Sequence, residues 1–213
     1  MGTFYKEGPL SKKHTGTVGA IGCLSFNGNK IITAGGGGII LSDNKNIAVK
    51  AKYLTTQAKD DPIKYIHNEI GYNFRLTNIQ AALGLAQMEQ LPQFLALKKD
   101  IHSRYRKEIE DIYGLSIAKG PNYSINNYWL NILKIDFSKY ERSVEDVLNS
   151  LAKHNIQTRP VWKLNHSQKP FVNFEAYKIS KAIKLVKSSL CIPSSSNLSE
   201  ESLSRVINCL KKK

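Results

Sequence analysis

The chain has 213 residues, of which 41% are hydrophobic and 23% charged, and its formal net charge is +14. This length suits one large or two small soluble domains, and no apolar run is long enough to span a bilayer. The start lacks the apolar core of a signal peptide and the three cysteines form no C-x-x-C pair, so we expect a cytoplasmic protein with no metal site and no disulfide framework.

The excess positive charge is distributed along the whole chain, and no basic run is interleaved with aromatic residues. This pattern is typical of a solvated, lysine-rich surface, and it also suits a small polyanionic or nucleotide-containing ligand. We therefore expect neither nucleic acid nor a membrane as a partner. Nucleic-acid binding stays open as a distant alternative.

The first half of the chain predicts two strands followed by helices. The strands are expected at 17–26, buried, and at 37–43, and a helix at 46–57. Residues 58–78 form a long polar segment whose aromatic content argues against disorder. A helix follows at 79–91, with Thr77 or Asn78 as its cap. The next helix runs from Pro92 to a stop at Gly114. Its apolar stripe is formed by Leu97, Ile101, Tyr105 and Ile109.

The second half predicts a compact α+β unit. The expected elements, in chain order, are a strand at 127–137, a helix at 143–155 capped by Ser143, an extended segment at 156–162, and helices at 174–190 and 199–210. The last helix carries an apolar face of Leu203, Val206, Ile207 and Leu210. We place a domain boundary inside the helix at 92–113, which gives domains 1–95 and 96–213.

The stretch "SFNGNKIITAGGGGII" places Lys30 between two apolar runs and beside four glycines. It fits neither a P-loop nor a dinucleotide fingerprint. Ser25 and the amides near Gly28 are donors suited to a phosphate, and a desolvated lysine amine is a nucleophile that can form a Schiff base with an aldehyde cofactor. The alternative from local evidence is a β-hairpin whose lysine only extends its amine to solvent.

The motifs "SFNGNKIITAGGGG", "GYNFRLTNIQAALGLAQMEQL" and "TRPVWKLNHSQKPF" resemble the DegT/DnrJ/EryC1/StrS family of nucleotide-sugar aminotransferases. The resemblance covers nearly the whole chain and is strongest to its LegC-like and UDP-N-acetylbacillosamine-type 4-aminotransferases. It implies an α/β fold of the aspartate-aminotransferase type (fold type I of the enzymes that use pyridoxal 5′-phosphate, PLP). Residues 1–95 would be the C-terminal part of the large PLP-binding domain, and 96–213 the small α+β domain.

The resemblance also implies roles for individual residues. Lys30 would bind PLP as a Schiff base, and Ser25 would bind its phosphate. The "GYNFRL" loop crosses a homodimer interface in this family, so Asn73 would reach the phosphate in the neighbouring subunit, with Arg75 near the anionic part of that site. The positions that match or neighbour the sugar-nucleotide pocket are His166, Arg159, Trp162 and Lys163.

Several of these residues have structural alternatives that the sequence leaves open. Asn73 could be a turn residue, and Arg75 could form an interface ion pair. His166 could be a surface or internally bonded histidine, and Trp162 next to Pro160 could belong to the core.

The implied reaction transfers an amino group, from glutamate in this family, to C4 of a nucleotide-linked 4-keto-6-deoxy-N-acetylhexosamine in surface-glycan biosynthesis, with Lys30 moving the proton. Members of the family are roughly twice as long as this chain. The half that carries the acidic partner of the pyridine nitrogen is not matched here, so we expect an N-terminally truncated or split enzyme. A catalytically inactive fragment or dimerisation module of the family is the alternative.

Overall fold

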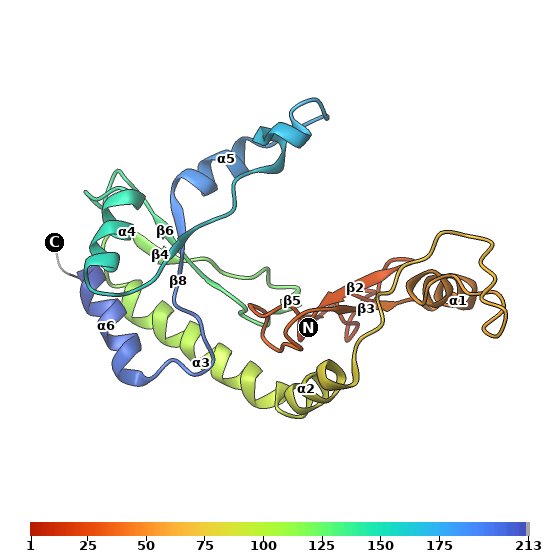
Figure 1. Cartoon of the computed structure of the whole chain (residues 1–213). Coiled ribbons are helices and arrows are strands. Elements are labelled where there is room, and N and C mark those ends of the chain that lie inside the picture. The colour runs from red at the N-terminus through yellow and green to blue at the C-terminus, as the bar shows by residue number, and fades with distance from the viewer. Residues whose placement is uncertain (212–213) are drawn as a thin grey trace. The chain divides into compact units, whose positions relative to one another are not determined.

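The computed structural model describes residues 1–211 and divides the chain into two compact units (Figure 1). Unit 1 comprises Met1–Leu95 and Gly120–Asn127. Unit 2 comprises Ala96–Lys119 and the chain from Tyr128 onward. Within residues 1–211, no helix has both the length and the apolar character needed to cross a membrane, and no group of His, Cys, Asp and Glu side chains is arranged to hold a metal ion.

Unit 1 contains two small antiparallel ribbons and two helices. The elements are β1 (Phe4–Tyr5) paired with β5 (Ser124–Ile125), β2 (Gly22–Ser25) paired with β3 (Gly38–Leu41), α1 (Lys45–Thr55) and α2 (Asn78–Glu89). Of the two caps predicted for α2, the structure has Thr77. Its hydroxyl accepts from the amide of Gln80 at 3.3 Å, and the Gln80 side chain accepts from the Thr77 amide in return.

The β2–β3 ribbon is less covered than the sequence predicts. Consecutive strand residues point to opposite faces. Because Ile39 is 44% exposed and Ile40 is 46% exposed, neither face of the ribbon is fully covered. The expectation of a buried strand at 17–26 is therefore wrong in extent and in burial. Only Gly22–Ser25 is a strand, since that is the stretch that pairs with β3.

Unit 2 is built on a four-stranded antiparallel sheet in the order β4-β6-β8-β7. Its strands are β4 (Leu115–Ile117), β6 (Asn131–Ile135), β7 (Arg159–Pro160) and β8 (Ser189–Ile192). The helices are α3 (Leu91–Ile109), which begins in unit 1, α4 (Val144–Lys153), α5 (Ser180–Lys187) and α6 (Glu200–Lys211). Two 3₁₀ helices, η1 (Asn165–Ser167) and η2 (Lys169–Phe171), follow β7.

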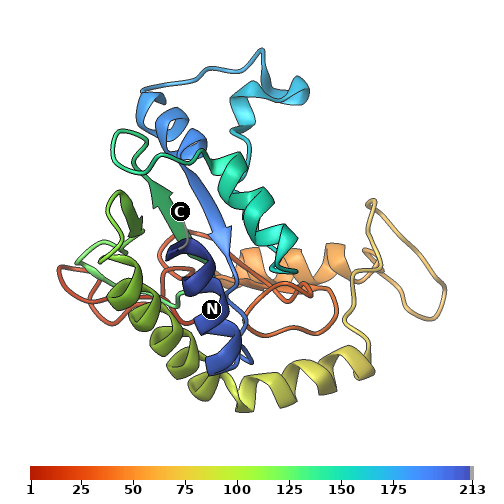
Figure 2. The same cartoon turned by 90° about the vertical axis from the view of Figure 1, so that its left-hand side faces the viewer.

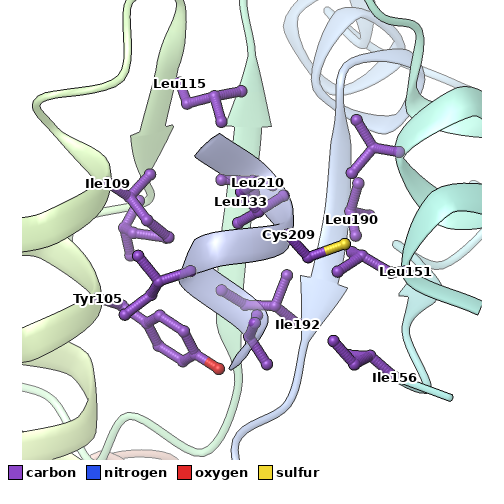
Figure 3. Close-up of a cluster of buried hydrophobic side chains, with 14 of the residues drawn as sticks. Tyr105, Ile109, Leu115, Leu133, Leu151, Ile156, Leu190, Ile192, Cys209 and Leu210 are labelled. Carbon is purple, nitrogen blue, oxygen red and sulfur yellow. The ribbon is translucent and has the colours of Figure 1, made fainter. Parts of the chain in front are cut away.

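The core of unit 2 lies between one face of this sheet and the helices α3, α4 and α6 (Figures 2 and 3). Leu133 of β6 is fully buried and is paired in register with Ile117 of β4 and Leu190 of β8, so the three side chains share that face. Arg104 of α3 forms an ion pair with Glu200 of α6, which ties the two helices together. The predicted apolar face of α6 is confirmed, because all four of its residues are buried.

Three expectations for unit 2 are corrected. The helix expected at 174–190 covers only Ser180–Lys187, and the end of that stretch belongs to β8, which pairs with both β6 and β7. The stripe on α3 holds from Ile101 onward, but Leu97 is 38% exposed and Lys98 is buried in its place. The helix ends at Ile109, and Gly114 lies in the following turn with φ +86°.

Candidate active site

Ser25 is the last residue of β2, and Lys30 lies on the loop that connects β2 to β3. Asn27 organises the loop, because its main-chain oxygen accepts from the Lys30 amide at 3.0 Å and its side-chain oxygen accepts from the Gly28 amide at 2.9 Å. The Ser25 hydroxyl oxygen accepts from the Asn27 amide at 3.3 Å. A hydroxyl and a lysine amine are thus carried by one hydrogen-bonded turn.

The far side of the loop is anchored by main-chain bonds and by two buried side chains. The main-chain oxygen of Phe26 accepts from the Ala34 amide and from the Thr33 hydroxyl, both at 3.0 Å. The Phe26 amide donates to the oxygen of Gly37 at 3.0 Å. Ile32 and Ala34 are each only 2% exposed, so the segment after Lys30 is fixed by packing as well as by hydrogen bonds.

The loop packs on α2 through small residues. A Cβ added to Gly84 of α2 would lie 3.7 Å from the Cβ of Ala34, which is ordinary van der Waals contact. One helical turn further, the Gln87 side chain accepts from the Thr33 amide at 3.4 Å. The alanine- and glycine-rich sequence of α2 is therefore what allows the Lys30 loop to approach the helix.

The glycine run has a backbone explanation at three positions. Gly35 and Gly37 have φ of +78° and +80°, a region that side chains rarely adopt. A Cβ on Gly38 would stand 2.5 Å from the main-chain oxygen of Leu24, so the ribbon closes only around glycine there. The idea that these glycines also leave room for a planar ring stays a prediction.

Lys30 is half-buried, and a second amine lies near it. Burial lowers the pKa of the Met1 amino group, and the positive charge of Lys30 lowers it further.

Asn73 and Arg75 lie elsewhere in unit 1, on an extended segment beside the end of α1. Asn73 forms an isolated antiparallel bridge with Thr56, and the Arg75 guanidinium donates to the main-chain oxygen of Thr56 at 3.2 Å. The rings of Tyr72 and Phe74 stack at 5.1 Å. Both Asn73 and Arg75 are exposed, so their side chains are accessible on the surface of this unit.

The other four predicted residues lie in unit 2, on and after β7. Arg159 is an exposed residue of β7, Lys163 is exposed, and His166 is half-buried in η1. Trp162 is 62% exposed, so it is not part of the core of unit 2. The structure thus places Ser25 and Lys30 on one loop, Asn73 and Arg75 on one segment, and the remaining four on one stretch of unit 2.

A hollow of about 280 Å³ in unit 1 lies between β3 and α1. None of the predicted site residues lines it. Its lining consists of Gly38, Ile39, Ile40, Ser42, Ala48, Ala51, Lys52, Thr55 and Phe74.

Two features of unit 2 were missed from the sequence. Trp129 lies with its ring centroid 5.9 Å from that of Trp162. Lys98 and His102 of α3 are 6% and 5% exposed, although both are polar. Their positions between the apolar residues of the α3 stripe were the available signal, because residues three and four apart share one helical face.

The sequence model of the DegT/DnrJ/EryC1/StrS aminotransferase family matches residues 1–211. The chain belongs to this family. The predicted resemblance is therefore confirmed, and it extends over both units.

Curated relatives of this DegT-family chain include aminotransferases and enzymes named for nucleotide-linked sugars. EpsN of Bacillus subtilis, which its name assigns provisionally to the PLP-dependent aminotransferases, is 37% identical over 99% of this chain and 53% of its own length. The GDP-perosamine synthase of Escherichia coli O157:H7 is 33% identical over 89% of this chain and 50% of its own. A Campylobacter jejuni UDP-4-amino-4,6-dideoxy-N-acetyl-beta-L-altrosamine transaminase is 28% identical over 91% of this chain and 50% of its own length. The chain spans about half the length of the curated relatives it matches.

Solved structures of other DegT-family proteins confirm the predicted fold class. The aminotransferase TlmJ from Streptoalloteichus hindustanus superposes with a TM-score of 0.86, at 20% identity, over 98% of this chain and 54% of that one. Helicobacter pylori PseC, an aminotransferase involved in the biosynthesis of pseudoaminic acid, superposes with a TM-score of 0.85 at 22% identity. The match covers 97% of this chain and 56% of PseC. At these identities, the likeness shows a common fold.

The Lys30 loop of this DegT-family chain fits two parts of PLP. A lysine amine suits the aldehyde of the cofactor, and a serine hydroxyl with neighbouring main-chain amides suits its phosphate. Both groups are on one anchored turn. Lys30 and Ser25 are therefore the residues that could hold the cofactor.

Proposed function

We propose that this chain is the cofactor-lysine half of a PLP-dependent sugar aminotransferase. The whole enzyme would transfer an amino group, with glutamate as donor, to C4 of a nucleotide-linked 4-keto-6-deoxy-N-acetylhexosamine in surface-polysaccharide biosynthesis. The observation that carries the proposal is the position of Lys30 beside Ser25 on one anchored loop, in a chain that matches an aminotransferase family over residues 1–211. Residues 1–95 would be part of the large cofactor-binding domain, and 96–213 the small domain.

In this proposal PLP supplies an aldehyde that binds amines and a ring that withdraws electrons. The Lys30 amine holds the cofactor between turnovers. The role of the Lys30 Nζ would be to move protons: it would take one from the α-carbon of the amino-acid donor and, in the second half-reaction, deliver one to C4 of the sugar. The turn at Asn27 would keep the Lys30 main chain in place while its side chain moves, and the Ser25 hydroxyl would bind the phosphate.

The remaining predicted residues would bind the anionic groups. Asn73 and Arg75 are proposed to serve the site of a second subunit in a homodimer, and their exposure on unit 1 supports that role. Arg159, Lys163 and His166 are proposed to bind the diphosphate of the sugar nucleotide, since guanidinium and ammonium groups pair well with phosphate oxygens. The names of the relatives, which include GDP- and UDP-linked sugars, support a nucleotide sugar as substrate.

The test is covalent trapping of the cofactor lysine. The purified chain is incubated with PLP, reduced with borohydride and digested, and the pyridoxyl mass is located by mass spectrometry. We expect the label on Lys30, its loss in Lys30→Ala, and its retention in Lys45→Ala, a matched change at an exposed lysine. Equal labelling across many lysines, or none on Lys30, would contradict the proposal.

A second candidate function is an interaction module of the same family without activity. The observation that favours it is the exposed surface of α2. The helix has no buried residue, and its apolar side chains Ile79 and Leu85 are 84% and 63% exposed. Such an apolar helix surface is typical of a protein–protein contact. Sedimentation of the chain and of Ile79→Lys, together with the trapping experiment, separates the two. A chain that associates through α2 but never labels at Lys30 supports the module.

A further inference from the structure

Trp129 and Trp162 form an aromatic pair on unit 2. Their ring centroids are 5.9 Å apart with an interplanar angle of 31°, within the range of favourable aromatic contacts. Trp162 is 62% exposed, so one partner of the pair is accessible. They are the two tryptophans of the whole sequence, and they come from segments that are far apart in chain order.

The main chain beside Trp129 is held by a polar cluster on α3. The Lys98 amine donates to the main-chain oxygen of Trp129 at 3.0 Å and also to that of Ser194. One turn along the helix, the His102 Nδ1 lies 2.8 Å from the side-chain oxygen of Asn131. The cluster therefore fixes the segment just before β6 on both sides of Trp129.

The residue before Trp129 has an uncommon backbone conformation. Tyr128 has φ +48°, which is sparsely populated for any residue except glycine. Its ring stacks on that of His102 with centroids 4.1 Å apart. Strained residues persist only where their surroundings fix them, and they gather at functional sites. Here the strain turns the chain immediately before the paired tryptophan.

Cationic side chains follow the same segment as Trp162. Arg159 and Lys163 are exposed on either side of it, and His166 is half-buried in η1. An exposed aromatic face beside arginine and lysine suits a ligand that combines a flat ring with phosphates, because the ring stacks while the phosphates pair with the cations.

We propose that Trp129 and Trp162 form one platform that stacks on the nucleobase of a nucleoside diphosphate sugar, and that Lys98 is a positioning residue that keeps Trp129 beside Trp162. The inference rests on the proposed function for the choice of a nucleotide sugar. It adds a base-binding site and a role for Trp129, Lys98 and the strained Tyr128.

The test uses intrinsic tryptophan fluorescence, since all of that signal comes from the proposed platform. The full chain is titrated with UDP and with GDP, and with N-acetylglucosamine 1-phosphate as a probe that lacks a base. We expect saturable quenching by at least one nucleotide and none by the sugar phosphate. Quenching by the sugar phosphate alone would overturn the assignment to the base.

Variants then place the site. Calorimetry should show binding weakened about ten- to hundredfold in Trp162→Ala and less strongly in Trp129→Ala. Tyr177→Ala, an aromatic residue of unit 2 that is 72% exposed, is the matched control and should bind as the wild type does. Equal affinity in the wild type and both tryptophan variants would overturn the platform.

The positioning role of Lys98 has its own readout. In a Trp162→Phe background, where Trp129 is the remaining tryptophan, Lys98→Met should shift the fluorescence emission of Trp129. In the otherwise native chain, Lys98→Met should weaken nucleotide binding. Binding is measured at a temperature where circular dichroism shows that the variant is folded. A folded Lys98→Met with unchanged emission and affinity would overturn that role. Borohydride labelling of Lys30 does not depend on these residues. If the platform fails its test, the proposed function is unaffected. If labelling fails, the proposed function is refuted and the nucleotide-binding result is unaffected.

Discussion

Lys98 of α3 donates a hydrogen bond to the main-chain oxygen of Trp129 at 3.0 Å, across 31 positions of the chain. The same amine donates to the oxygen of Ser194, 96 positions away, so one buried lysine joins three segments of unit 2. Burial lowers the pKa of Lys98 to about 8. The contribution of this buried amine to the unfolding free energy therefore depends on pH.

The unfolding free energy of the wild type should rise with pH above 8 relative to that of Lys98→Met. In the unfolded chain Lys98 keeps its ordinary pKa of about 10.4. Between this value and the folded pKa of about 8, the unfolded state binds more protons, so raising the pH favours folding. The gain by pH 9.5 is on the order of 2 kcal/mol, from about 1.4 kcal/mol per pH unit. Urea unfolding of both proteins at pH 7 and 9.5 measures it, and a constant difference between them would contradict it.

Tyr105→Phe should destabilise unit 2 by about 1 kcal/mol. The Tyr105 hydroxyl donates to the main-chain oxygen of Pro193 at 3.0 Å, and the side chain is fully buried. Removing the hydroxyl leaves that carbonyl oxygen without this donor while the ring still packs. Thermal unfolding is the measurement. Tyr113→Phe, at a ring that is 73% exposed, is the control and should leave the melting temperature unchanged.

Gly38→Ala should disrupt the ribbon that carries the Lys30 loop, and Gly36→Ala should not. The added Cβ at Gly38 would meet the main-chain oxygen of Leu24 at 2.5 Å, whereas at Gly36 the nearest atom is the Gln80 side-chain nitrogen at 3.9 Å. We expect Gly38→Ala to lower pyridoxyl labelling of Lys30 several-fold and Gly36→Ala to retain it. Equal labelling of the two variants would mean that the ribbon does not position Lys30.

Ser143→Ala should destabilise α4 by about 1 kcal/mol. The Ser143 hydroxyl accepts from the Asp146 amide at 3.1 Å, and the Asp146 carboxylate accepts from the Ser143 amide at 2.9 Å. The Ser143 hydroxyl also donates to the Asp146 carboxylate at 2.6 Å, and this bond, followed by the one from the Ser143 amide, lowers the pKa of Asp146. Glu145→Gln, in the same turn but outside this pair of bonds, is the matched control. Urea unfolding at pH 7 compares them, and equal losses would argue against a specific cap.

Local chemistry in the sequence was enough to place several elements. The caps Thr77 and Ser143 and the apolar face of α6 depend on residues within one or two turns, so their patterns predict the helices directly. The role expected of Lys30 came from the family resemblance of several motifs rather than from its own short stretch, and it stays a prediction. The family match then confirms the lineage that the motif indicated.

Tertiary structure decided the features that depend on distant partners. Ser189–Ile192 is a strand because β6 and β7 lie on either side of it, although the helix expected at 174–190 includes its first two residues. Lys98 is buried because carbonyl oxygens of Trp129 and Ser194 satisfy its amine. Trp129 and Trp162 lie in contact because β6 and β7 both pair with β8, which brings the segment before β6 close to the segment after β7. A local pattern records helix caps and amphipathic faces, whereas pairing in a sheet and burial of a charge are determined by residues that are remote in sequence.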